Sequence, residues 1–306
     1  MPVEHYRSAK PLESGAQVAL IAPAGPLQKP EDLPNAQENA RVFGWEPIVG
    51  PHATERVGYL AGHDRDRLND LNRALRDPKI DAIWCLRGGY GMMRILAGVD
   101  FDALSRIPKA IIGYSDITAL HAAVQRKCRL VTYHGPHSRE ALTEFSRDSL
   151  RRAVVEQSDS CGVAPNAREI NAGVAEGRLV GGNLAVLSSL CGTPFAPDLS
   201  DGILILEDIN EPVYRIDRML QQLKLSGAFN GCRAIVFGEC VKCPEDAGGG
   251  GRPFDEVLSE IAHSLGVPCL AGIPVGHIAE QWTIPLGAMA KLDTSERRLT
   301  VTSYKS

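Results

Sequence analysis

The residues around Ser115 have the pattern of a serine nucleophile. A β-branched run at residues 110–113 ends in glycine, and Ser115 lies in the turn before a helix that starts near Asp116. This strand–turn–helix arrangement lifts a hydroxyl above the edge of a sheet and points the first N–H groups of the helix at the atom attacked. Ser115 or Asp116 could instead only cap the helix, and Ile117 stands where the glycine of the usual elbow is found.

A second turn that could do chemistry is Arg87-Gly-Gly-Tyr-Gly, which follows an apolar strand. Gly88 and Gly89 allow a ligand to approach the backbone closely and offer N–H donors, either to a phosphate or to an oxyanion. The turn matches neither the P-loop nor the dinucleotide-binding fingerprint, and a plain tight turn is an alternative.

A serine nucleophile needs a base, and the base needs an orienting carboxylate. Among eight histidines, His277 stands out because it ends the run 270–277 at the mouth of a predicted sheet. Glu207 and Asp208 follow an apolar strand at residues 203–206. A strand-end acid can also be solvated or cap the next helix, so neither signal is decisive alone.

These candidates belong to a predicted α/β fold. In the first half, strands at 17–22, 46–49, 82–86, 110–113 and 130–133 alternate with amphipathic helical stretches such as 31–43 and 63–76. Strands separated by helices of this length indicate a parallel sheet covered on both faces. Ligands bind at the carboxyl ends of such strands. We therefore expect a Rossmann-like N-terminal domain over residues 1–156.

The pattern changes at residues 157–177, which are small and polar and predict a linker. Residues 178–306 predict a smaller α/β domain with mixed strands. Its expected elements are strands at 202–206 and 234–237, helices at 213–225 and 254–265, and a hairpin of 288–292 with 298–302. Ser115 precedes the linker while Glu207 and His277 follow it, so a site made of all three requires both domains.

Composition narrows the class of protein. The chain has 306 residues, 44% of them hydrophobic, and a net charge of −4. This balance is typical of a soluble globular protein, and without a dense basic stripe we expect no nucleic-acid partner. No apolar run approaches the roughly 18 residues that span a bilayer, and no leader is evident. We expect a cytoplasmic protein.

The eight cysteines do not form the dense framework of a small secreted domain. Cys240 and Cys243 form a C-x-x-C pair, but no second pair follows to complete a zinc site. We interpret the pair as incidental and expect no metal.

Taken together, these motifs resemble the LD-carboxypeptidases, the serine peptidases of family S66, which include the microcin C immunity proteins. The resemblance covers residues 18–301. The motifs that carry it, in the order seen in the family, are Arg87-Gly-Gly-Tyr-Gly, Gly113-Tyr-Ser-Asp-Ile-Thr, Gly181-Gly-Asn-Leu, Leu206-Glu-Asp with the downstream Tyr214-Arg-Ile-Asp-Arg-Met-Leu, and Gly276-His277.

The resemblance implies a Ser–His–Glu triad divided between the domains. Ser115 would be the nucleophile and His277 the general base, and Glu207 would orient His277. The backbone N–H groups of Gly89 and Asp116 would form the oxyanion hole. The family needs no cofactor or metal. For the terminal carboxylate of the substrate that the resemblance implies, Arg87 is a candidate, although an arginine beside a glycine turn can equally hold the loop in place.

The substrate implied is a murein tetrapeptide, cleaved before its terminal D-alanine, in cytoplasmic recycling of peptidoglycan fragments. Within the family, the alternative is hydrolysis of an acyl-adenylate, which requires an aromatic platform for adenine, and Trp282 is a candidate. Outside the enzymes, the alternative is a non-catalytic nucleotide- or phosphate-binding module. The sequence leaves a homodimer open.

Overall fold

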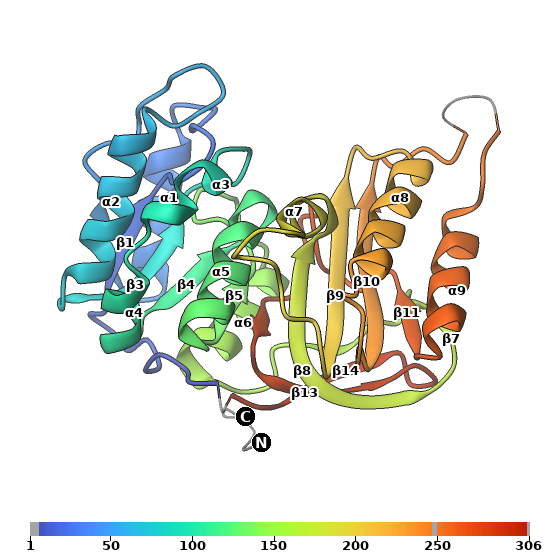
Figure 1. Cartoon of the computed structure of the whole chain (residues 1–306). Helices are drawn as coiled ribbons and strands as arrows, with labels where there is room; N and C mark the ends of the chain where they lie inside the picture. The colour runs from blue at the N-terminus through green and yellow to red at the C-terminus, as the bar shows by residue number, and fades with distance from the viewer. Residues whose placement is uncertain (1–5, 247–249, 305–306) are drawn as a thin grey trace.

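Two β-sheets lie side by side in the computed structural model, which describes residues 6–246 and 250–304 (Figure 1). The first sheet has the order β12-β5-β4-β3-β1-β2, with β12 antiparallel to β5 and all other neighbours parallel. Its strands are β1 (Gln17–Ile21), β2 (Glu46–Val49), β3 (Ile80–Cys85), β4 (Ala110–Gly113), β5 (Thr132–His134) and β12 (Ile284–Leu286). Its helices are α1 (Asp32–Val42), α2 (Asp64–Arg76), α3 (Met92–Ile95), α4 (Phe101–Arg106) and α5 (Thr118–Cys128).

The second sheet has the order β6-β14-β13-β8-β9-β10-β11-β7, and the run from β8 to β11 is parallel. Its strands are β6 (Gly162–Val163), β7 (Arg168–Asn171), β8 (Val174–Asn183), β9 (Gly202–Ile209), β10 (Ala234–Val241), β11 (Cys269–Ala271), β13 (Met289–Asp293) and β14 (Arg298–Ser303). Further α-helices are α6 (Glu144–Arg151), α7 (Leu184–Leu190), α8 (Val213–Leu225) and α9 (Phe254–Leu265). The predicted α/β class, a parallel sheet followed by mixed strands, is confirmed.

Residues 157–177, predicted to be an irregular linker, carry β6, β7 and the start of β8. The chain therefore passes between the two halves as part of the second sheet. The division into domains at residues 156 and 178 stays a prediction.

The strand pleat explains why the first sheet is buried on both faces. Val18 and Leu20 of β1 enter one hydrophobic cluster, while Ala19 and Ile21 enter another on the opposite face. The helical spacing predicted for residues 63–76 is also explained by packing. Leu71 and Leu75 lie on one face of α2 and are buried in this second cluster.

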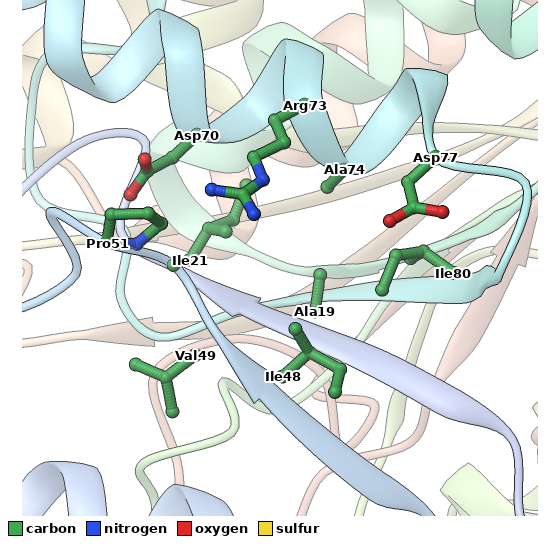
Figure 2. Close-up of a pocket in the computed structure, with 11 residues that line it drawn as sticks. Ala19, Ile21, Ile48, Val49, Pro51, Asp70, Arg73, Ala74, Asp77 and Ile80 are labelled. Carbon is green, nitrogen blue, oxygen red and sulfur yellow. The ribbon is translucent and has the colours of Figure 1, made fainter.

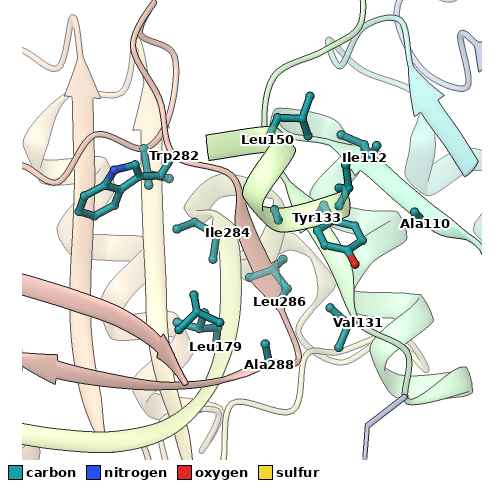
Figure 3. Close-up of a cluster of buried hydrophobic side chains, with 14 of the residues drawn as sticks. Ala110, Ile112, Val131, Tyr133, Leu150, Leu179, Trp282, Ile284, Leu286 and Ala288 are labelled. Carbon is teal, nitrogen blue, oxygen red and sulfur yellow. The ribbon is translucent and has the colours of Figure 1, made fainter. Parts of the chain in front are cut away.

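Strand β12 joins the two halves of the molecule. It comes from the C-terminal half yet pairs with β5, placing Ile284 opposite His134 and Leu286 opposite Thr132. Figure 3 shows Leu286 between Tyr133 of the first sheet and Leu179 of the second, with Ile284 beside Leu286. All four side chains are buried in one hydrophobic cluster. One continuous core therefore underlies both sheets.

Cys240 and Cys243 form a disulfide at the end of β10. The interpretation of this pair as incidental was wrong: the turn after β10 brings the two Cα atoms to 5.7 Å, within the range that a disulfide spans.

Across residues 6–246 and 250–304, no group of three or more potential ligands could hold a metal ion. In the same part of the chain, no helix has the length and apolar character needed to cross a membrane.

The shared core predicts a large effect for Leu286→Ala. Leu286 has no exposed surface, so its truncation should lower the free energy of unfolding by about 2–5 kcal/mol. The matched control is Leu225→Ala, because Leu225 is 86% exposed, and a change within about 0.5 kcal/mol is expected there. Urea denaturation measures both. Equal effects of the two variants would contradict a core that depends on β12.

Candidate active site

Ser115 lies in a strained turn directly after β4. Its φ angle is 60°, in the left-handed region that residues other than glycine rarely adopt, and a short 3₁₀ turn (Ser115–Ile117) then leads into α5. Holding such a residue costs about 1–3 kcal/mol and requires support from the surrounding structure. The predicted strand–turn–helix is present, and its strain is typical of functional sites.

Gly88 provides part of that support. A Cβ atom at this position would lie 2.8 Å from Cβ of Ser115 and 3.1 Å from the backbone nitrogen of Asp116, so only glycine fits. The Gly88 carbonyl accepts a hydrogen bond from the N–H of Gly25 at 2.7 Å. Because C=O and N–H point in opposite directions across a trans peptide, this bond directs the N–H of Gly89 away from Gly25.

The structure brings Ser115, His277 and Glu207 into one hydrogen-bonded chain. Oγ of Ser115 lies 3.1 Å from Nε2 of His277, and Nδ1 of His277 lies 2.8 Å from Oε2 of Glu207. Glu207 is completely buried, whereas His277 is partly exposed. With its proton on Nδ1, His277 donates to Glu207 and presents a free acceptor to the Ser115 hydroxyl.

The neighbouring acid, Asp208, points elsewhere. Its carboxylate accepts hydrogen bonds from the Ala185 N–H at 2.9 Å and from the Asn183 side-chain amide at 3.2 Å, at the start of α7. Burial, together with the negative charge of Glu207, raises the pKa of Asp208 to about 6. Asp208 therefore holds the start of α7, and Glu207 is the acid that meets His277.

Asp116 has a structural bond of its own. Its buried carboxylate accepts a hydrogen bond from the Met92 N–H at 2.8 Å, and burial raises its pKa to about 6. This contact ties the turn at Ser115 to the glycine-rich turn that contains Gly89. The two backbone N–H groups expected to form an oxyanion hole therefore belong to turns that are fastened together.

Sequence reasoning did not identify the residues that pack beside His277. The ring of Tyr114 meets the His277 ring edge to face, with 4.9 Å between centroids. The Tyr114 hydroxyl donates to Glu140 at 2.9 Å, and His137 contacts the same carboxylate oxygen at 3.2 Å. His134 ends β5 and His137 follows it, but the sequence pattern does not show which of the two lies near the site.

Two serines of α6 fix the segment that follows His277. Ser146 Oγ donates to the Ala279 carbonyl and accepts from the Gln281 N–H, both at 2.9 Å. Ser149 Oγ accepts from the Thr283 N–H at 2.8 Å. These residues lie one helical turn apart on the buried face of α6, a polar pattern that sequence analysis passed over.

Opposing effects set the pKa of His277. Burial is the largest single effect and favours the neutral ring, but the hydrogen bond and charge of Glu207 and the charges of Asp208 and Glu140 together favour the cation and outweigh it. The pKa of His277 is therefore raised above its ordinary value. A raised pKa suits a group that must accept a proton during a reaction and later return it.

Two hollows differ in their relation to these groups. An open groove of about 360 Å³ is lined by Phe145, Pro274, Ile278 and Glu280, so it adjoins the segment carrying His277. A smaller cavity of about 160 Å³ lies between α2 and the edge of the first sheet, lined by residues such as Ile48 (Figure 2). No member of the Ser115–His277–Glu207 chain lines either hollow, but Ile278, which follows His277 directly, lines the groove.

The chain matches known families and proteins over almost its whole length. The family model for the LD-carboxypeptidase N-terminal domain matches residues 18–135, and the model for the LD-carboxypeptidase C-terminal domain matches residues 176–292. A probable murein peptide carboxypeptidase from Bacillus subtilis is 38% identical, covering 94% of this chain and 92% of the relative.

A solved structure and a further relative extend the comparison. The crystal structure of muramoyltetrapeptide carboxypeptidase from Oxalobacter formigenes is similar with a TM-score of 0.81 and 30% identity, covering 94% of this chain and 98% of that one. The microcin C7 self-immunity protein of Escherichia coli is 28% identical, covering 85% of this chain and 84% of the relative.

The balance of effects at His277 gives a pH prediction. Glu207→Gln keeps the burial but removes the negative charge that favours the cation, so the pKa of His277 should fall. NMR titration of the imidazole measures this shift directly. Glu280→Gln is the control, because Glu280 is exposed three residues along the chain, and it should leave the pKa unchanged. An unchanged pKa in Glu207→Gln would show that the hydrogen bond between Glu207 and His277 does not control the pKa of His277.

Proposed function

Since the chain belongs to the LD-carboxypeptidase family, we propose that it is a serine carboxypeptidase that removes the terminal D-alanine from murein tetrapeptides. The observation that carries the proposal is the continuous chain from Ser115 through His277 to Glu207, with contacts of 3.1 and 2.8 Å. This is the geometry of a nucleophile, its base and the group that orients the base.

In the proposed reaction, the Ser115 hydroxyl attacks the carbonyl carbon before the terminal residue while His277 takes its proton. The N–H groups of Asp116 and Gly89 stabilise the negative charge that develops on the carbonyl oxygen. His277 then gives its proton to the leaving amine, the C–N bond breaks and D-alanine departs. Water, activated by the same imidazole, hydrolyses the acyl-enzyme and restores the Ser115 hydroxyl.

The L,D specificity of the bond and a role in cytoplasmic recycling of wall fragments are part of the proposal. They are supported by relatives whose names refer to murein peptides, including the Oxalobacter formigenes enzyme at 30% identity. No step requires a metal or an organic cofactor, because the triad and the two backbone donors account for each proton and charge.

The alternative within the family, acyl-adenylate hydrolysis, receives a specific test from the structure. Trp282 is only 3% exposed and packs in the core, so it cannot be the adenine platform considered for it. Tyr90 is exposed, directly follows Gly89 and meets Tyr59 edge to face. An adenine could stack on this pair, which is why an acyl-sulfamoyl adenosine belongs in the assay beside the murein peptide.

Ser115→Ala should lower D-alanine release from L-Ala–D-Glu–meso-diaminopimelate–D-Ala by several orders of magnitude, because a triad acts as a unit. His277→Ala should be equally severe, and the double variant no worse than either single one. The free energy of unfolding should change by only about 1 kcal/mol in Ser115→Ala, since one hydroxyl is lost from a turn.

Ser189→Ala is the matched control, since Ser189 is exposed on α7 and should leave activity unchanged. A fluorophosphonate probe should label the wild type and not Ser115→Ala. If Ser115→Ala kept more than about a tenth of the wild-type rate, well above what triad loss leaves, the mechanism would be wrong. Absence of labelling in folded wild type would favour the non-catalytic binding module.

A further inference from the structure

Three arginines from distant parts of the chain converge on the loop between β1 and α1. Arg87 Nη1 donates to the Pro26 carbonyl at 2.8 Å, and Arg56 Nη2 donates to the Leu27 carbonyl at 2.5 Å. Arg139 Nη1 lies 3.6 Å from Oδ1 of Asp32. These contacts bring together the segments after β2, β3 and β5. We call Arg56, Arg87 and Arg139 the arginine cluster.

The charges of the cluster are not balanced by the protein around Arg87. Burial lowers the pKa of the Arg87 guanidinium, and the positive charges of Arg139 and Arg56 lower it further, whereas Asp32 opposes them. Asp32 is buried and already accepts hydrogen bonds from the backbone N–H groups of Gln28 and Lys29. Of the carboxylates nearby, Asp32 faces Arg87 and Arg139, while Glu140 interacts with Arg139 and is already bonded to Tyr114 and His137. Arg87 therefore has two like charges and one opposite charge as neighbours, a setting suited to an anion.

The cluster lies beside the nucleophile. The dipeptide Gly88–Gly89 separates Ser115 from the Arg87 guanidinium: a Cβ on Gly88 would be 3.1 Å from Oγ of Ser115, and a Cβ on Gly89 would be 3.6 Å from Cζ of Arg87. A ligand bound against this dipeptide would therefore contact the Ser115 hydroxyl at Gly88 and the Arg87 guanidinium at Gly89.

We propose that the arginine cluster binds the terminal carboxylate of the peptide, with Arg87 as the direct contact; this inference rests on the proposed function. In a peptide, that carboxylate lies about 3 to 4 Å beyond the scissile carbonyl carbon. The guanidinium fork matches a carboxylate in two parallel hydrogen bonds. The positive charges of Arg56 and Arg139 add to the electrostatic attraction that Arg87 exerts on the carboxylate. The cluster thereby makes the enzyme specific for a free chain end.

Holding the loop is the simpler role for Arg87, and it accounts for the bond to Pro26. That bond uses one N–H of the five that a guanidinium carries. It does not explain why Arg56 and Arg139 approach the same segment, at Leu27 and Asp32. The two roles make different predictions for a substrate whose terminal carboxylate is replaced by an amide.

The test compares the tetrapeptide with its C-terminal amide. Arg87→Ala should lower kcat/KM for the free acid by about 30-fold or more, the loss expected for a hydrogen-bonded charge pair, and should change the amide by less than about 3-fold. Arg87→Lys, which keeps the charge but not the fork, should fall between wild type and Arg87→Ala. Arg41→Ala is the control, since Arg41 is exposed on α1, and it should alter neither substrate.

Equal losses on the acid and the amide would overturn the inference and leave Arg87 as a residue that holds the loop. If the wild type cleaved neither peptide, the proposed function would fail on its own. The inference is then decided by protection of Ser115 from the fluorophosphonate probe. N-acetyl-D-alanine should slow labelling in wild type and not in Arg87→Ala, and its amide should slow neither. Lack of protection in wild type would overturn the inference.

Discussion

The pairing of β12 with β5 is the constraint on which the proposed site depends. His277 precedes β12 by seven residues, and the antiparallel register that sets Ile284 against His134 fixes where the intervening segment ends. Ser146 and Ser149 hold that segment from α6. On the other side of His277, the Val275 carbonyl accepts a hydrogen bond from the Glu239 N–H of β10 at 2.9 Å. The imidazole is thus held between the two sheets, with Ser115 after β4 of the first and Glu207 in β9 of the second. A site made of residues far apart in the chain acquires a fixed geometry because β12, a short strand from the C-terminal half, pairs with β5 of the first sheet.

The buried carboxylate of Glu207 is stabilised by the imidazole that the same arrangement places beside it. A buried carboxylate is unfavourable unless it is paired. Glu207 has no exposed surface, and it is paired with the imidazole of His277, whose cation it stabilises. Asp208, next in the chain, is directed to the start of α7 by the alternation of side chains along β9. Adjacent acids therefore take different roles: Glu207 contacts the imidazole and Asp208 fixes a helix.

Much of the arrangement could be predicted from the sequence, because it depends on local pattern. The apolar runs before Ser115 and Glu207 predict strands, and polar residues after parallel strands meet at one edge. The rest depends on tertiary contacts. Strand β12 is three residues long and has no recognisable period, Trp282 reads equally well as a core residue or a platform, and the Cys240–Cys243 bond depends on a turn. The convergence of Arg56, Arg87 and Arg139 has no signature in their spacing.

The crossover strand also has a consequence for the timing of biosynthesis. A nascent chain can form β1 to β5 early, since N-terminal units generally fold first during synthesis. Until Leu286 has left the ribosome, however, β5 remains an unpaired edge, and His277 has no fixed place near Ser115. The growing polypeptide would carry its nucleophile for more than half of its translation without a base to activate it. Late delivery of β12 would keep a hydrolase inert while its own unfolded segments are still within reach.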